Sequence, residues 1–424
     1  MERRSGHACI RLEYGAGRLP AGAEGGSAVL ITCHAWYHEQ IGGSFKIATE
    51  LAEHLAGRGH RVFYVCGSRE RAPVKATIER GVELWRYPLP PAGLPHPAAL
   101  LYHVRATFRL TREILRRRPV GCINGHTPLQ FLGASLAARR TGARLVYSVH
   151  SPFDDELDCR RNGRRKRAAD RLAIMTARAI DRKNCRRASV VQCCSRFTAG
   201  VLRQKYGPPV TRKTRIAPGW VDIERFRPLN DKAAVRARLG AAWHTARPVF
   251  FTVRRLEARM GLQQLVEAAG MLRRQGFQFR LLIGGAGPLE ANLREQIQQA
   301  GLQETAHLLG RIAEDELPLC FSAADCFVLP TRALECFGLI VLEAYASGTP
   351  VIGTPVGAIP ELVALQGPEW LTAGTGAREI ADRMAAFLRG ELVGNRTKLR
   401  ALAERWRADL VLQQFREILT PCPT

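Results

Sequence analysis

The stretch from Ala324 to Glu361 constrains the fold of this chain more than any other segment. It reads ADCFVLPTRALECFGLIVLEAYASGTPVIGTPVGAIPE. An apolar run from Cys326 to Leu329 stops at a proline, a helical stretch spans about Phe337 to Ser347, and Gly348 ends that helix before a second apolar run. A strand, a loop, a helix and a strand in this order predict parallel strands with a helix packed over them.

Two glutamates lie before and within the predicted helix. Glu335 lies in the loop, and Glu343 lies about two turns into the helix. A helix N-terminus has unpaired N–H groups and about half a positive charge, which suits a pyrophosphate, and Gly338 lets the backbone come close. Each carboxylate can accept two hydrogen bonds from a vicinal diol, so one can hold a sugar and the other a ribose. The alternative, an amphipathic helix with two solvated glutamates, is disfavoured because the neighbouring residues are apolar.

The segment PTRALECFGLIVLEAYASGTPVIGTPVGAIPE resembles the donor-binding signature of family 4 retaining glycosyltransferases. The resemblance implies an α/β protein with the GT-B fold, in which two Rossmann-like domains face each other across a cleft. It implies that Glu335 contacts the transferred sugar, that the Gly338 and Leu339 amides contact the phosphate, and that Glu343 contacts the ribose.

The same alternation of strands and helices begins near residue 27. SAVLITC reads as a buried strand, and the turn after it contains Gly42 and Gly43 before a helical stretch. Paired glycines alone more often indicate an ordinary turn, but the resemblance places them by the donor phosphate or the acceptor. We predict an atypical or disordered extension over 1–26, an acceptor-side domain over 27–227, a donor-binding domain over 228–405, and a helix over 406–424 that returns to the first domain.

The segment RLVYSVH reads as a strand that ends at His150. Ligands of open α/β sheets collect at the carboxyl ends of strands. The resemblance implies a histidine here, close to the transferred sugar and the acceptor, so His150 is a predicted catalytic residue. His126, after the preceding strand, is the weaker candidate. Most histidines that end a strand are structural, so this prediction depends on the resemblance.

A further loop carries the predicted cations of the donor site. The resembled family has Gly-Arg-Leu followed four residues later by Lys-Gly, and both cations reach the diphosphate. This chain has Arg254-Arg255-Leu256, so Arg255 is retained and predicted to be catalytic, whereas Met260 replaces the lysine. Two phosphates need positive partners when no metal is present, so Arg259 or Arg254 is expected to supply the missing charge. By the resemblance, the segment HLLGRI edges the nucleotide base with Arg311 and Ile312.

Length and composition exclude several classes of protein. A chain of 424 residues is long enough for two α/β domains of ordinary size. It contains no apolar run of membrane-spanning length and no signal-peptide core at its N-terminus, so a cytoplasmic location is expected. The 12 cysteines include no C-x-x-C pair, so they are expected to be reduced and to bind no zinc. We expect no metal and no cofactor beside a UDP- or GDP-linked sugar donor.

The positive charge is concentrated in the first half of the chain. Residues 1–227 hold 41 Lys and Arg against 18 Asp and Glu, whereas residues 228–424 hold 22 against 20. Between Arg160 and Arg187, 12 of the 28 residues are Lys or Arg. Apolar residues keep helical spacing through this stretch: Ala168, Leu172, Met175, Ala179 and Ile180. Such a helix can lie on the anionic inner face of the plasma membrane, clamp an anionic acceptor, or present a solvated face.

The sequence therefore predicts a retaining glycosyltransferase of the hexosyltransferase class. It would move a hexose-type sugar from UDP or GDP to a hydroxyl of a glycan, a glycolipid or a small molecule, in polysaccharide or glycoconjugate synthesis. The acceptor, anionic or lipid-linked, stays open. A nucleotide-sugar 2-epimerase of the same fold and an inactive nucleotide-sugar-binding subunit are the alternatives. No recognised module supports specific nucleic-acid binding.

Overall fold

The computed structural model describes residues 28–40, 42–69, 76–91, 96–160 and 168–419. The predicted extension over residues 1–26 lies outside these residues. The chain divides into two compact units, Met1–Arg144 and Leu145–Thr424. The predicted domain boundary at residue 228 stays a prediction.

The first unit is built on a mostly parallel sheet. Its strands are hydrogen-bonded in the order β3-β4-β2-β1-β5, and only β3 runs antiparallel to its neighbour. Every residue of β1 and β2 is buried, as expected for strands that helices cover on both faces. The strands are β1 (Ala28–Thr32), β2 (Val62–Ser68), β3 (Thr77–Glu79), β4 (Val82–Pro88) and β5 (Val120–Gly125), and the helices are α1 (Gly43–Gly57), α2 (His96–Arg117) and α3 (Pro128–Ala137).

The second unit begins with three more parallel strands, which pair in the order β6-β7-β8. Four helices alternate with these strands, and the longest, α5, packs against α4. The elements are β6 (Arg144–Val149), α4 (Phe153–Arg160), α5 (Ala168–Arg187), β7 (Val190–Cys193), α6 (Arg196–Tyr206), α7 (Pro208–Thr211) and β8 (Thr214–Ile216).

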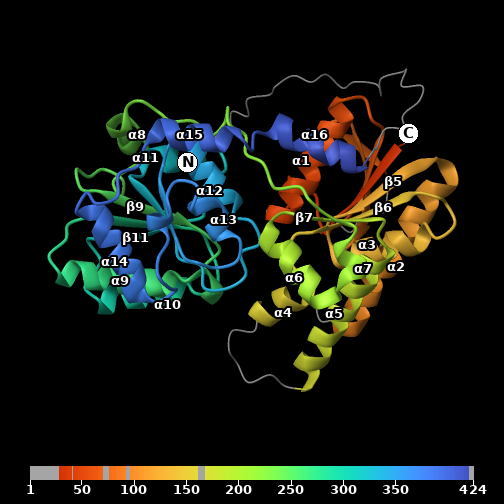
Figure 1. Cartoon of the computed structure of the whole chain (residues 1–424), viewed down its shortest axis with the longest axis horizontal. Helices are drawn as coiled ribbons and strands as arrows, with labels where there is room; N and C mark the ends of the chain where they lie inside the picture. Colours follow the sequence, from red (N-terminus) through yellow and green to blue (C-terminus); the bar gives the residue numbers. More distant parts are fainter. Residues whose placement is uncertain (1–27, 41, 70–75, 92–95, 161–167, 420–424) are drawn as a thin grey trace, which may run out of the picture. The chain divides into compact units, whose positions relative to one another are not determined.

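A five-stranded, wholly parallel sheet forms the rest of the second unit, in the order β11-β10-β9-β12-β13. Helices α8, α11, α12 and α15 cover one face, and α9, α10 and α14 cover the other (Figure 1). The strands are β9 (Val249–Val253), β10 (Arg280–Gly284), β11 (Ala306–Gly310), β12 (Cys326–Leu329) and β13 (Val351–Gly353). The helices are α8 (Lys232–Leu239), η1 (Ala258–Met260), α9 (Leu262–Arg274), α10 (Glu290–Gln299), α11 (Leu317–Ala323), α12 (Leu339–Ala346), α13 (Ile359–Val363), η2 (Pro368–Trp370), α14 (Ala377–Leu388), α15 (Arg396–Glu404) and α16 (Ala408–Leu419).

The predicted strand, loop, helix and strand after Ala324 are confirmed as β12, α12 and β13. The helix begins at Leu339, two residues later than expected, because Gly338 has a φ of 93° and acts as its N-cap. The mostly parallel strands and the helices that alternate with them confirm the predicted α/β class. Among the described residues, no helix combines the length and apolarity that crossing a bilayer requires.

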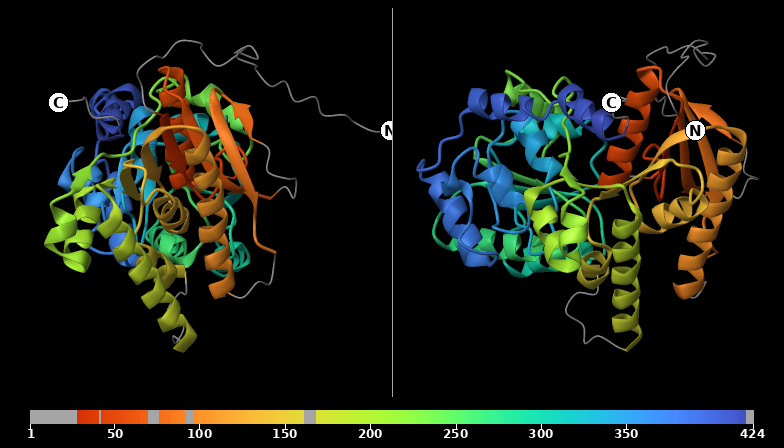
Figure 2. Two further views of the ribbon diagram at one scale, coloured as in Figure 1. Left: turned by 90° about the vertical axis from the view of Figure 1, so that its right-hand side faces the viewer. Right: turned by 45° about the vertical axis from the view of Figure 1, so that its right-hand side comes forward.

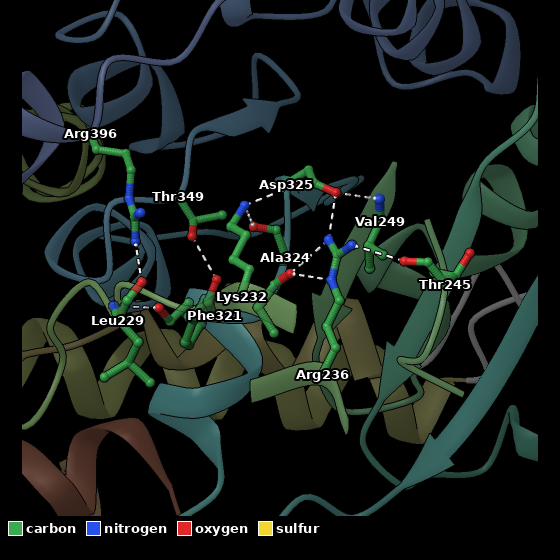
Figure 3. Close-up of polar contacts among 12 residues, drawn as sticks. Leu229, Lys232, Arg236, Thr245, Val249, Phe321, Ala324, Asp325, Thr349 and Arg396 are labelled. Atoms are coloured by element: carbon green, nitrogen blue, oxygen red, sulfur yellow. Dashed lines mark hydrogen bonds and ion pairs between the residues drawn. The ribbon is translucent and has the colours of Figure 1, made fainter. Parts of the chain in front are cut away.

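Asp325 fixes the segment that leads into the five-stranded sheet (Figure 3). Its carboxylate accepts hydrogen bonds from Lys232 Nζ at 2.8 Å, from Arg236 Nη2 at 2.6 Å and from the backbone N–H of Val249 at 2.8 Å. Helix α8 and the first residue of β9 are therefore tied to the residue that precedes β12. Because β12 leads directly into the loop of Glu335, this network also fixes the strand that carries the candidate site.

Candidate functional site

The N-terminus of α12 and the loop before it form the centre of the site. Gly338 is buried and left-handed, and the helix that follows it points its first backbone N–H groups toward the loop of Glu335. A residue with a side chain is strained at a φ of 93°. Leu334 is left-handed as well, with a φ of 58°, which is uncommon for a leucine. The backbone on both sides of Glu335 is therefore held in conformations that place its carboxylate just before the helix.

Arg254 and Glu335 form a largely buried ion pair. Arg254 Nη2 lies 2.6 Å from Glu335 Oε2, and the two side chains are 9% and 16% exposed. Arg254 Nη1 also donates to Thr331 Oγ1 at 3.1 Å. The sequence left Arg254 as one of two sources of a missing charge. In the structure, Arg254 pairs with Glu335, the residue that the resemblance predicts to contact the transferred sugar.

The other predicted cations have different environments. The Arg255 side chain is 72% exposed, and its Nη2 lies 3.1 Å from Glu257 Oε1. Arg259 is more enclosed, and its Nη1 donates to the carbonyl of Leu334 at 3.1 Å. Arg259 therefore supports the left-handed residue beside Glu335. Met260 is buried in the apolar core, so the position of the family's lysine carries no charge here.

Gly261 allows the two loops of the site to touch. It is left-handed, with a φ of 73°, and a Cβ placed on it would lie 1.7 Å from the carbonyl oxygen of Pro330. The backbone N–H of Arg332 donates to the carbonyl of Arg259 at 2.8 Å. The loop after β9 and the loop after β12 therefore pack backbone to backbone, which brings Arg254 within reach of Glu335.

Helix α6 and Cys194, two residues before it, also hold this region. The carbonyl of Cys336 accepts hydrogen bonds from Cys194 Sγ at 3.2 Å and from Thr198 Oγ1 at 3.3 Å. The carboxylate of Glu361 accepts from the first two backbone N–H groups of α6, at 3.0 and 2.6 Å. Both ends of the segment between Glu335 and Glu361 are thus fixed by one helix.

The remaining predicted donor-site residues are spread over several loops. Glu343 lies on the second turn of α12 and is 9% exposed. Arg311 is exposed, and Ile312 packs on Gly284 at the end of β10. Gly42 and Gly43 belong to the other compact unit, where Gly42 caps α1. The described contacts bring together Glu335, Arg254, Arg259 and Gly338, and the roles of all predicted site residues stay predictions.

His150 follows the last residue of β6, as predicted. Burial lowers the pKa of His150 to about 4, against a smaller opposite effect of the Glu156 charge. The imidazole is therefore neutral near pH 7, and it can donate or accept a hydrogen bond without adding charge to the site. His126 is 2% exposed, and its Nε2 lies 2.7 Å from Asn124 Oδ1, which favours a structural role.

Asp181 positions the loop of His150, and no sequence motif predicted this role. Its carboxylate accepts from Tyr147 Oη at 2.6 Å and from the backbone N–H of Phe153 at 2.6 Å, so it clamps the residues on both sides of His150. Burial raises the pKa of Asp181 to about 7, although these two hydrogen bonds lower it. The available signal was an acidic residue within a strongly basic helix.

Metal-ligating side chains do not gather at this site. In the ranges that the structure describes, no three His, Cys, Asp or Glu side chains are arranged to hold a metal ion. Two cavities, of 390 and 360 Å³, lie along α2 and between α9 and α10, and no predicted site residue lines either one.

Comparison with known proteins finds two sequence families. Residues 41–225 match Glycosyltransferase Family 4, and residues 240–406 match Glycosyl transferases group 1. A GDP-mannose-dependent alpha-(1-6)-phosphatidylinositol monomannoside mannosyltransferase of Mycobacterium tuberculosis is 32% identical over 51% of this chain and 56% of its own length. The protein of that name from Mycolicibacterium smegmatis is 32% identical over 63% of this chain and 67% of its own length.

Another relative matches a slightly shorter segment than the Mycobacterium tuberculosis protein does. The putative colanic acid biosynthesis glycosyltransferase WcaL of Escherichia coli is 34% identical over 48% of each chain. This chain thus spans about half the length of the first curated relatives that it matches.

Solved structures share the fold. Sucrose-phosphate synthase from Thermosynechococcus elongatus superimposes with a TM-score of 0.74 at 20% identity, over 92% of this chain and 98% of its own. Anabaena HepE in complex with UDP and glucose superimposes with a TM-score of 0.71 at 19% identity, over 93% of this chain and 99% of its own. These identities are low, so the likeness establishes the architecture alone.

Proposed function

The chain belongs to the family 4 glycosyltransferases and has the GT-B architecture, and we propose that it transfers a hexose-type sugar from UDP or GDP to a hydroxyl acceptor. The main support is the position of Glu335, immediately before the N-terminus of α12 and paired with Arg254 at 2.6 Å. A carboxylate, a cation and a helix N-terminus together suit a compound that carries both hydroxyl groups and a diphosphate.

Each part of the donor would have its own partners. The N–H groups of Gly338 and Leu339 would donate to phosphate oxygens, and the Glu343 carboxylate would accept from the ribose hydroxyls. The Glu335 carboxylate would accept from sugar hydroxyls while Arg254 fixes its orientation. Arg255 is exposed enough to turn from Glu257 toward the diphosphate. Arg311 and Ile312 would edge the base.

The proposed reaction retains the configuration of the anomeric carbon. The bond between that carbon and the phosphate oxygen breaks, and its electron pair stays on the diphosphate. The acceptor oxygen forms the new bond on the same face, and its proton passes to a phosphate oxygen. The α12 amides and the arginines stabilise the charge on the leaving group, so this scheme needs no metal. Neutral His150 would hydrogen-bond to the sugar or the acceptor.

The donor and the acceptor are proposed only as classes. The mycobacterial relatives are named for GDP-mannose and a phosphatidylinositol mannoside, whereas HepE was solved with UDP and glucose. UDP-sugars and GDP-sugars are therefore both candidate donors. A lipid-linked compound and a glycan are both candidate acceptors. The acceptor would lie on the basic first half of the chain. A cytoplasmic location stays a prediction.

The test is a thermal-shift screen of UDP- and GDP-sugars with mass spectrometry of the products. One nucleotide class should raise the melting temperature, and Glu335→Gln should remove turnover. Glu404→Gln is the matched control, because Glu404 lies on α15 and its side chain is 52% exposed. Appearance of an epimer with donor alone would favour the epimerase, and binding without turnover would favour the inactive subunit. No response to any nucleotide sugar would contradict the proposal.

A further inference from the structure

Helix α5 exposes two large apolar side chains to water. Leu172 is 65% exposed and Met175 is 66% exposed, and they lie one helical turn apart. Among the exposed large apolar residues of the described ranges, no other two lie within one turn of a helix. Adjacent exposed apolar side chains that are rimmed by polar residues are typical of a surface that contacts a partner or a membrane.

The fold buries side chains only in the C-terminal half of α5 and leaves one side of its N-terminal half exposed. No residue from Ala168 to Thr176 is buried, and the buried side begins at Ala177 and continues through Asp181, Asn184 and Cys185. Lys213 Nζ donates to the carbonyl of Arg186 at 2.8 Å, which anchors the end of the helix. Both views of Figure 2 show the N-terminal end of α5 extending past α4, α6 and α7, the other helices of this part of its unit.

Cations continue the apolar row along the same side of the helix. Residues that recur every three or four positions share a face, and here they are Ala168, Leu172, Met175, Ala179, Arg182 and Arg186. Arg171 and Arg178 flank this face and are exposed. Of the two acidic residues on the described helix, Asp181 points inward to Tyr147. The exposed side of α5 is therefore apolar at one end and strongly cationic along the rest.

We propose that this side of α5, here called the α5 face, docks on an anionic lipid bilayer. Leu172 and Met175 would enter the boundary between headgroups and acyl chains, and the arginines would pair with lipid phosphates. A nucleic acid or an anionic glycan would be bound by cations and would leave the apolar pair in water. The apolar pair therefore favours lipid over these polyanions. Docking would bring the enzyme to a membrane whether or not its acceptor is a lipid.

Helix α2 provides an internal comparison. Arg105, Arg109, Arg112 and Arg116 form an exposed cationic row on it, but Leu101 is its one exposed large apolar residue. If charge alone decided membrane binding, the two helices would contribute alike. If an exposed apolar pair is also needed, α5 should contribute more to membrane binding than α2 does.

The experiment is co-sedimentation of the full chain with vesicles at physiological ionic strength, without a sugar donor. Vesicles of phosphatidylcholine with about one third phosphatidylglycerol should bind the wild-type protein, and pure phosphatidylcholine should not. Leu172→Ser with Met175→Ser should weaken binding about tenfold or more, since two apolar side chains lose their burial. Arg178→Glu with Arg182→Glu should weaken it by at least about tenfold.

Two controls keep the result interpretable. Val393→Ser removes an apolar side chain that is 79% exposed on the same unit, and it should leave binding unchanged. Arg109→Glu with Arg112→Glu tests the α2 row, and it should change binding less than the α5 charge variant. Circular dichroism and donor-induced melting shifts should be the same for every variant, because the substituted side chains are exposed.

Three results would overturn the proposal. The wild-type protein could fail to bind anionic vesicles, or the α2 variant could remove binding while the α5 variants retain it. The serine variant could also bind vesicles as well as the wild type does, while the α5 charge variant loses binding both to vesicles and to heparin, a soluble polyanion. That result would mean that the α5 face binds polyanions in general. As a direct readout, Leu172→Trp should shift its emission to the blue on anionic vesicles and be quenched by brominated lipid.

Discussion

Replacing Arg254 by methionine should destabilise the loop that carries Glu335. The two side chains are 9% and 16% exposed, and Arg254 Nη2 lies 2.6 Å from Glu335 Oε2. Charge centres about 4 Å apart at an effective dielectric constant near 20 attract by about 4 kcal/mol. Arg254→Met leaves the carboxylate enclosed without its partner, and this kind of change lowers the free energy of unfolding by roughly 3 kcal/mol.

A double-mutant cycle measures the pair itself. The proteins are the wild type, Arg254→Met, Glu335→Gln and the double variant, compared by urea unfolding at pH 7. We expect a coupling energy of about 2 kcal/mol, because the double variant leaves no isolated charge and recovers most of the stability. The control is Arg255→Met, which removes a neighbouring arginine whose side chain is 72% exposed. It should change the free energy of unfolding by no more than about 0.5 kcal/mol.

The cycle can refute the reasoning in two ways. A coupling energy below about 0.5 kcal/mol would mean that solvent screens the pair despite its burial. If Arg254→Met and Arg255→Met lowered the free energy of unfolding equally, the burial of Arg254 and its pairing with Glu335 would not explain the effect. The same variants also test the donor site, because Arg254→Met should weaken binding of the matching nucleoside diphosphate in calorimetry.

The remaining predictions concern stability. Gly261→Ala should cost more than about 3 kcal/mol by thermal unfolding, because its Cβ would meet Pro330 O at 1.7 Å, whereas Gly57→Ala, at the open end of α1, should be neutral or slightly stabilising. The pKa of His150 is about 4, below its ordinary value, so the unfolded chain takes up a proton first and stability falls as the pH drops from 6.5 toward 4. Urea unfolding should show a loss of about 3 kcal/mol there, which His150→Gln reduces; an unchanged profile would contradict the assignment. Burial raises the pKa of Asp325, but Lys232 and Arg236 outweigh it and lower the pKa below its usual value. Its stabilisation is thus present at neutral pH and lost in acid, so Asp325→Asn should cost about 2 kcal/mol at pH 7 and less near pH 3 in calorimetry; a pH-independent difference would refute this.

Local sequence signals placed the elements of the candidate site correctly. Pro330 stops β12, Gly338 caps α12 and Gly348 follows its end, and each of these residues acts on its own stretch of backbone. Local rules extend over a few residues, which is why they found a strand, a loop, a helix and a strand without knowing their neighbours. The left-handed Leu334 escaped prediction, since leucine carries no local preference for that conformation.

Spacing alone did not determine which arginine meets Glu335. The match to the family pattern places Arg255 at the diphosphate and gives no arginine partner for Glu335. Neighbouring residues on an extended chain point to opposite sides. After β9 that alternation turns Arg254 toward the loop of Glu335 and Arg255 toward solvent. The direction of each side chain depends on the contact between two loops that are about 75 residues apart in sequence, and no local pattern encodes it.

The sequence by itself determined the α/β architecture, the helix before which Glu335 lies, and the apolar and basic character of α5. Only the tertiary structure decided which side of α5 is covered. Helical spacing fixes which residues share a face, but the neighbours that the fold supplies select the face that is buried. Here Tyr147 and the N-terminus of α4 meet Asp181, so Leu172 and Met175 are left on the surface.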